Sequence, residues 1–374
     1  MKDLKIREYF PIVKEKIFLN HAGVSPICIP VAEAIQDYLK HRILGEEGSF
    51  EIDSARDLFA RLINAKSDEV ALVPNTSTGL NIIANLLEYP CSSNIVTSDL
   101  EFPSVVYPWL RIQLKSDLDV RYVRNVKGTL KPEEFERAID DHTVAVVISH
   151  VEYANGFKND LKEIAELAHQ HGAFLVVDAC QSVGAMRIDV KRQGIDFLAT
   201  SCYKWLLGPS GAGFLYIRGE LIERAEPVFV GWASVKPEIF ETVDLWNNTR
   251  LFFSGTARRF EIGTSSSISY VGAMAALRLI LNYGIEKIEN RIMDLTSYLI
   301  ERLKEEGFPL QTSEDLHNRS GIVNFKISDP EEKVEKLHQR GVVISARMNG
   351  IRVSPHFYNT REEIEKFLTY IKEI

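Results

Sequence analysis

The sequence predicts an α/β protein with a mostly parallel seven-stranded sheet that carries helices on both faces. Short apolar runs alternate with amphipathic stretches along much of the chain, which is typical of a doubly wound sheet. The runs are almost continuously apolar, as expected for strands buried on both faces. Expected strands cover 70–73, 94–98, 120–123, 144–149, 173–179, 196–201 and 213–217, and expected helices include 31–44, 78–87 and 161–171.

A second, smaller unit is expected after this sheet, because 374 residues exceed the size at which a single core stops growing. We expect a large domain over 16–265 and a small C-terminal α+β domain over 266–374, with residues 1–15 packing nearby. A helical region through 277–306 should link the two. The small domain should contain strands within 321–327, 342–345 and 351–355, and helices near 331–340 and 362–374.

Charge and composition exclude several classes of protein. The net charge is −8, from 44 basic and 52 acidic residues, and basic residues do not cluster, which argues against a nucleic-acid or anionic-membrane partner. No stretch approaches the roughly 20 apolar residues of a membrane span. The four cysteines form no CxxC pair and the histidines show no metal-ligand spacing, so we expect no metal site. These features favour a cytoplasmic protein.

Chemistry-bearing residues follow the expected strands, at the edge where open α/β sheets bind ligands. Asp178 ends one strand and is followed by Gln181. A carboxylate at a buried edge needs a cationic partner, and a protonated pyridine nitrogen is one such partner. The alternative is an aspartate that only caps the following loop.

Lys204 follows the strand at 196–201 and precedes the apolar stretch 205–207. Desolvation by these neighbours would weaken its ammonium form, so that the amine becomes nucleophilic and able to form an imine. A surface lysine whose stem packs on apolar residues is the alternative.

A phosphate site is expected where the first strand meets a helix. Thr76 and Ser77 stand in the segment PNTSTG (74–79), which opens that helix, and hydroxyls with free N–H groups at a helix N-terminus bind phosphate. Ser201 and Tyr203 could donate to the same group. Phe102 is a candidate platform for a flat ring, with core packing as the alternative. A phosphate cradle, a ring platform, a carboxylate and a lysine are together what pyridoxal 5'-phosphate (PLP) needs.

The sequence also resembles a known family, the class V aminotransferases of the fold-type I PLP-dependent transferases. This family includes cysteine desulfurases, selenocysteine lyases, isopenicillin N epimerase and, more distantly, kynureninase. The most specific stretch is 176–217, VVDACQSVGAMRIDVKRQGIDFLATSCYKWLLGPSGAGFLYI. Supporting stretches lie at 18–26, 75–84, 101–104, 149–156, 258–264 and 351–367.

The resemblance implies a role for each candidate residue. Lys204 would hold PLP as a Schiff base, Asp178 would pair with the pyridine nitrogen, and Gln181 would contact the phenolic oxygen of the ring. Arg352 would bind the α-carboxylate of a small amino-acid substrate, as a guanidinium fork suits. Further implied contacts to the phosphate come from Thr76, Ser77, Ser201 and Tyr203, and Thr264 would reach the phosphate of the partner subunit in a homodimer. His21 and Ala22 are candidates for contact with the substrate, as is Trp232. A purely structural role is the alternative for His21 and Trp232.

The chain departs from the cysteine desulfurases at three points. Phe102 stands where they have a histidine over the ring, and Tyr153 stands where they have an asparagine near the ring oxygen. Residues 342–352 contain no cysteine, and Cys202 lies inside the lysine motif, where it is misplaced for a persulfide. A persulfide-forming desulfurase is therefore disfavoured, and residues 101–104 with the segment 352–360 look closer to the epimerase-like branch.

We therefore expect a PLP-dependent aminotransferase or lyase that acts on a small amino acid through an α-carbanion. C–S bond cleavage, as in desulfurases and selenocysteine lyases, and epimerisation remain alternatives, because all start from the same carbanion. A non-catalytic PLP-binding protein is an alternative from another class. A nucleotide-dependent enzyme would need a glycine-rich turn where residues 74–79 read PNTSTG.

Overall fold

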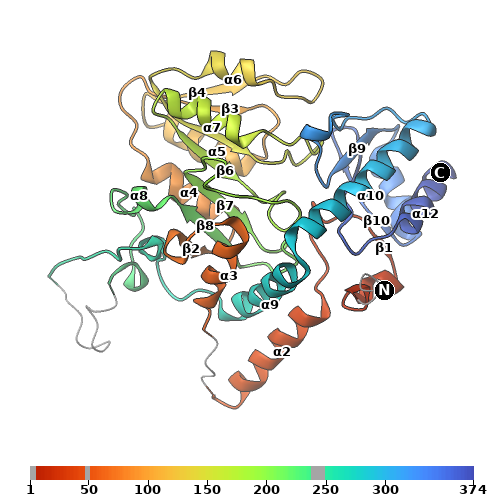
Figure 1. Ribbon diagram of the computed structural model, residues 1–374, viewed down its shortest axis with the longest axis horizontal. Coiled ribbons are helices and arrows are strands. Elements are labelled where there is room, and N and C mark those ends of the chain that lie inside the picture. Colours follow the sequence, from red (N-terminus) through yellow and green to blue (C-terminus); the bar gives the residue numbers. More distant parts are fainter. Residues whose placement is uncertain (1–5, 47–50, 237–248) are drawn as a thin grey trace.

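The computed structural model describes residues 6–46, 51–236 and 249–374 and confirms the predicted α/β architecture (Figure 1). The central sheet has the strand order β2-β8-β7-β6-β5-β3-β4. Only β8 runs against its neighbours, and the remaining strands share one direction. The strands are β2 (Val70–Val73), β3 (Asn94–Ser98), β4 (Asp119–Val123), β5 (Thr143–Ser149), β6 (Phe174–Asp178), β7 (Phe197–Ser201) and β8 (Gly213–Ile217).

Helices cover both faces of this sheet, as predicted. Successive side chains of a strand enter different cores: Leu175 and Val177 of β6 pack on one face and Val176 on the other. The core on the first face includes α3 (Ser54–Ile63), α6 (Pro132–Ala138), α7 (Leu161–Gln170) and α9 (Ser267–Tyr283), and α2 (Ile29–Ile43) packs on α9. The second face is covered by α4 (Thr76–Leu86), α5 (Pro103–Gln113) and α8 (Gly219–Ile222).

A third core lies in the C-terminal part of the chain, where β11-β12-β9 form an antiparallel sheet. β1 pairs with β10 in parallel, so residues near the N-terminus join this unit. The labels β1 and β10 lie close together in Figure 1. The domain boundaries remain a prediction, and residues 1–5 of the predicted N-terminal segment lie outside the described residues. The elements are β1 (Ile17–Phe18), α10 (Ile285–Glu305), β9 (Val323–Lys326), α11 (Pro330–Gln339), β10 (Val342–Val343), β11 (Ser345–Arg347), β12 (Gly350–Val353) and α12 (Arg361–Lys372).

Two predicted elements differ in detail. The helical region at 277–306 is split between α9 and α10, which meet at Gly284 with a bend of 81°. Gly284 has φ +96°, which favours glycine and ends α9. The expected strand 342–345 is also divided, because its first half pairs with β1 and its end with β12. Short 3-10 turns are η1 (Pro11–Lys14), η2 (Ser67–Glu69), η3 (Trp232–Ser234), η5 (Ala257–Phe260) and η6 (Leu316–Asn318).

Within the described ranges, no single helix has the length and apolarity to cross a bilayer. Helices α9 and α10 have the length and apolarity of a membrane span only when they are taken together across their bend. Much of α9 is buried, mainly against α2 and α3, which accounts for its apolar character.

Candidate active site

The carboxyl ends of five codirectional strands surround a cavity of about 380 Å³. Most of the predicted cofactor-binding residues line it: Thr76, Ser77, Phe102, Tyr153, Asp178, Gln181, Ser201, Tyr203 and Lys204. Ser104, Ser149 and Cys180 also line this cavity and were missed. Ser149 could have been found by the rule that picked out the others, because it ends β5. Cys180 gives no sequence signal beyond its place two residues after Asp178.

One end of the cavity is formed by hydroxyls at the N-terminus of α4. Thr76 donates its backbone N–H to Ser201 Oγ at 2.8 Å, and its hydroxyl lies 2.7 Å from the same atom. Ser77 Oγ lies 2.8 Å from Ser104 Oγ. Gly79 lets α4 approach β7, because a Cβ there would lie 2.8 Å from Ala199 Cβ. The positive end of the helix dipole and these donors suit a phosphate dianion.

Asp178 is buried at the end of β6 and accepts the Cys180 backbone N–H at 2.7 Å. Burial raises the pKa of Asp178 to about 6, although the Cys180 N–H and the Lys204 charge act to lower it. A carboxylate in this state is stabilised by a further cation. A protonated ring nitrogen would supply that charge.

The Lys204 amine lies 5.8 Å from the centre of the Phe102 ring and 5.6 Å from that of Tyr203. Burial works against its ammonium form, but Cys180, Tyr203 and Asp178 outweigh this, so the pKa of Lys204 is raised. Desolvation acts in the expected direction, but the expectation that it decides the net pKa shift was wrong. Those neighbours, residues 205–207, point into the core and leave the amine among polar groups of the cavity.

Phe102 and Tyr153 form an aromatic pair at the cavity wall. Their rings meet edge to face with centres 5.2 Å apart. Phe102 is 43% exposed, so its side chain does not belong to the core and is free to contact a ligand. Core packing, the alternative for this residue, is therefore wrong.

Arg352 does not line this cavity and is only 2% exposed, but it contacts Tyr153, which does line it. It donates to the Tyr153 carbonyl at 2.7 Å and from Nε to Ser345 Oγ at 3.2 Å. Burial and the nearby Arg347 lower the pKa of Arg352 to about 9. No ion pair joins Arg352 to a carboxylate among the described residues, so an anionic ligand would supply the missing counter-charge.

The other predicted substrate-binding residues, like Arg352, lie outside the lining of this cavity. His21 is buried, with Nε2 2.7 Å from Tyr358 Oη and Nδ1 2.9 Å from the Ser354 carbonyl. Ala22 is buried and its carbonyl accepts Gln181 Nε2 at 3.0 Å. Trp232 is 64% exposed. Contact of these residues with substrate stays a prediction.

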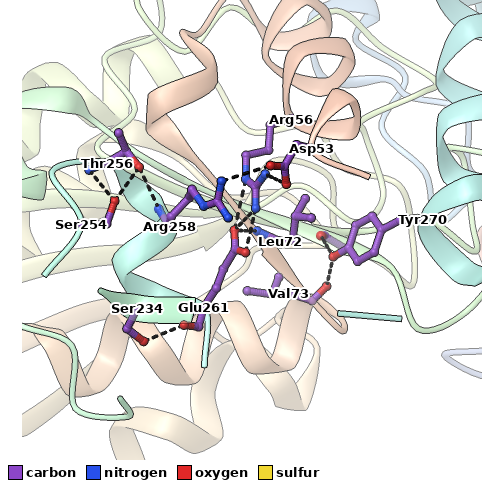
Figure 2. Close-up of polar contacts among 11 residues, drawn as sticks. Asp53, Arg56, Leu72, Val73, Ser234, Ser254, Thr256, Arg258, Glu261 and Tyr270 are labelled. Atoms are coloured by element: carbon purple, nitrogen blue, oxygen red, sulfur yellow. Dashed lines mark hydrogen bonds and ion pairs between the residues drawn. The ribbon is translucent and has the colours of Figure 1, made fainter. Parts of the chain in front are cut away.

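Thr264 lines a neighbouring cavity of about 410 Å³, which shares Pro74 and Gly211 with the first. The segment before Thr264 is fixed to α3 by a buried ion pair between Arg56 and Glu261 (Figure 2). The two side chains approach to 2.7 Å and are 7% and 5% exposed. Glu261 also accepts the Leu72 backbone N–H at 2.9 Å, which anchors the segment to the edge strand β2.

Residues 17–367 match the family model described as "Aminotransferase class-V". The chain belongs to this family. It is 34% identical over 362 residues to the uncharacterized aminotransferase YcbU of Bacillus subtilis (strain 168), covering 96% of this chain and 94% of the relative. The apo structure of a cysteine desulfurase from Thermococcus onnurineus NA1 is 27% identical, with TM-score 0.88, over 99% of this chain and 97% of that one.

A second solved structure is a C-DES variant with glycine covalently linked to the PLP cofactor; it is 24% identical, with TM-score 0.89, over 98% of this chain and 99% of that one. This class V aminotransferase-family protein is a PLP-dependent enzyme of fold-type I. The cavity fits the cofactor, because it combines hydroxyl donors at a helix N-terminus with a buried carboxylate that needs a cation. PLP supplies an aldehyde that forms an imine with an amine and a ring that withdraws electrons.

Two further carboxyls that the sequence did not point to lie beside the cavity. Glu101 accepts both the backbone N–H and the hydroxyl of Ser149, at 2.8 and 2.5 Å. Glu152 accepts Asn159 Nδ2 at 3.0 Å. Burial, with the Asp178 charge nearby, raises the pKa of Glu101 to about 8, although hydrogen bonds from Ser149 and Glu152 act to lower it. Burial, with Glu101 nearby, raises the pKa of Glu152 well above its usual value. The neutral forms are therefore favoured in the folded chain.

Stability should consequently depend on pH through this pair. An unperturbed glutamate titrates near 4.5, so the stability from the neutral forms is complete below pH 4.5 and is lost as the pH rises through about 8. The side chain that Glu152→Gln introduces cannot ionise. We therefore expect the free energy of unfolding of this variant to rise relative to that of the wild type between pH 5 and pH 8.5. The gain in free energy of unfolding should be at least about 1.4 kcal/mol, the equivalent of one pKa unit.

Chemical denaturation at both pH values measures this gain. Glu166→Gln, at an exposed glutamate that pairs with Lys162 at 3.7 Å, is the matched control and should show little dependence on pH. An equal difference between Glu152→Gln and wild type at both pH values would show that the pair is ionised in the folded chain.

Proposed function

We propose that this enzyme is an aminotransferase or lyase of a small amino acid and that it works without a persulfide-forming cysteine. The main support comes from the hairpin of β11 and β12, which contains no cysteine. This hairpin turns tightly at Met348 and Asn349, with φ +52° and +53°. This hairpin therefore cannot supply a thiol to the proposed site. Cys202 is buried in the core, and Cys180, although it lines the cavity, is buried two residues after Asp178 and does not lie on this hairpin.

In the proposed mechanism, three residues divide the work of binding, proton transfer and charge stabilisation. Arg352 binds the substrate carboxylate, for which its lack of an ionic partner among the described residues gives support. Lys204 is first the amine that binds the cofactor and then the base that moves the α-proton. Asp178 holds the proton of the ring nitrogen, and its burial strengthens that charge-assisted bond.

We also propose a cytoplasmic homodimer in which Thr264 contacts the phosphate of the partner subunit. Thr264 lies beside the cavity without lining it, which supports a role in a second copy. Large apolar side chains are exposed nearby at Trp232 and Ile262, and a second copy would cover them. The four cysteines are all unpaired, as fits a reducing compartment.

The products formed from single amino acids test the proposal. An aminotransferase converts alanine to pyruvate only when a 2-oxo acid is added as acceptor, whereas a lyase releases pyruvate, ammonia and sulfide from cysteine without one. Desulfurase-like C–S cleavage, which gives alanine instead of pyruvate, is the second candidate, favoured by the desulfurase among the solved structures. Alanine from cysteine, with sulfur held on the protein, would overturn the proposal in favour of a desulfurase. No product from any amino acid by a PLP-loaded protein would indicate a non-catalytic binder.

A further inference from the structure

The side chain of Gln181 lines the cavity, yet it is held by two hydrogen bonds from outside it. Its Oε1 accepts the indole N–H of Trp205 at 2.9 Å, and its Nε2 donates to the Ala22 carbonyl at 3.0 Å. Both neighbours are buried. An indole N–H can only donate and a carbonyl can only accept, so the two contacts permit one orientation of the amide.

This orientation leaves one amide hydrogen unused. Gln181 Nε2 carries two hydrogens, of which the Ala22 carbonyl takes one. The other is available to an acceptor in the cavity, beside Asp178 and Lys204. If the amide turned over, Oε1 would take this place and would repel an oxyanion.

Trp205 is itself fixed by the C-terminal unit. His356 Nε2 donates to the Trp205 carbonyl at 3.0 Å, while its Nδ1 accepts the Phe357 N–H at 2.9 Å. Burial lowers the pKa of His356 to about 4, so the neutral ring persists. Gly321 makes room for the indole, because a Cβ there would lie 2.6 Å from Trp205 Cη2. The indole N–H therefore has a single position.

We propose that Trp205 is a positioning residue, whose indole N–H locks the Gln181 amide so that its spare N–H faces the ring oxygen of the cofactor. This inference rests on PLP binding in the proposed site. It extends the site by a residue that does not touch the cofactor and that lies in the core behind it.

Trp205→Phe removes the N–H and keeps most of the ring. The amide can then turn over, and the ring oxygen loses a donor. We expect PLP to bind about tenfold more weakly, as for the loss of one hydrogen bond to a charged group. The ring oxygen would also hold the proton on the Lys204 nitrogen more strongly, so the pH midpoint of the near-visible cofactor band should rise by about half a unit or more.

Spectroscopic titration of the apo protein with PLP, and of the loaded protein with acid and base, measures both effects. Trp109→Phe is the matched control: Trp109 is equally buried but packs in the core on the opposite face of the sheet, so both values should stay unchanged. Thermal melting of the apo variants checks that they fold. Gln181→Met removes the amide while Trp205 stays intact, and it should also raise the pH midpoint of the near-visible cofactor band.

The double variant Trp205→Phe with Gln181→Met decides whether the tryptophan acts through the glutamine. The inference predicts that the second change adds nothing to the midpoint shift of Gln181→Met alone. Additive shifts, or a Trp205→Phe midpoint equal to that of wild type, would overturn it. A wild-type protein with no cofactor band would instead overturn the proposed function, so the two failures are distinguishable.

Discussion

Replacing Lys204 with alanine is expected to reduce turnover by about 10³-fold or more, the loss typical when a positioned proton-transfer group is removed. Lys204 is the one cavity-lining lysine in the described part of the chain, and its amine lies between the rings of Phe102 and Tyr203. Among residues 6–46, 51–236 and 249–374, no other lysine is placed to move the α-proton. The rate of product formation from the best amino acid of the screen measures the effect.

Lys204→Arg is the matched variant, because it keeps the positive charge and cannot form an imine. It should be as inactive as Lys204→Ala, which separates the chemistry of the amine from its charge. Lys162→Ala, at an exposed surface pair with Glu166, should retain wild-type activity. Substantial activity in Lys204→Arg would mean that the positive charge alone suffices.

The second large effect is expected on stability, from Glu261→Ala. This change leaves the buried Arg56 guanidinium without its main partner and the Leu72 N–H without an acceptor, although Asp53 still contacts Arg56 at 2.5 Å (Figure 2). Breaking one side of a buried ion pair typically costs about 3–5 kcal/mol. The free energy of unfolding from chemical denaturation measures the loss.

Glu134→Ala is the control, because it also removes a glutamate from an arginine–glutamate ion pair, in this case the exposed pair with Arg137 at 2.6 Å. It should lower the free energy of unfolding by less than about 1 kcal/mol. Replacing Arg56 and Glu261 together by methionine should recover much of the loss, since no charge then remains buried. An equally small effect of Glu261→Ala and Glu134→Ala would contradict the anchoring of the segment that carries Thr264.

The sheet could be predicted because each strand is a local signal. Runs such as 144–149 are apolar on both faces, and only a strand covered by helices on both sides needs this pattern. The division of 342–345 could not be predicted, because it depends on pairing with β1, more than 300 positions earlier. The break at Gly284 was visible in the sequence, but glycine alone does not end a helix.

The candidate site was predictable where residues follow strand ends directly, as Asp178 and Lys204 do. Interactions between distant segments were not. Arg56 and Glu261 are 205 positions apart, and nothing in either neighbourhood shows the pairing. The predicted direction of the pKa shift of Lys204 was wrong for the same reason. The groups that outweigh burial include Asp178, which a different strand brings beside Lys204.

Reductive trapping tests the central claim most directly. PLP-loaded protein would be treated with borohydride, which fixes an imine as a stable amine, and then digested and mapped by mass spectrometry. The account predicts that the cofactor mass appears on the peptide that contains Lys204 and disappears in Lys204→Arg. Trapping on another lysine, or no trapped cofactor in a protein that has bound PLP, would contradict it.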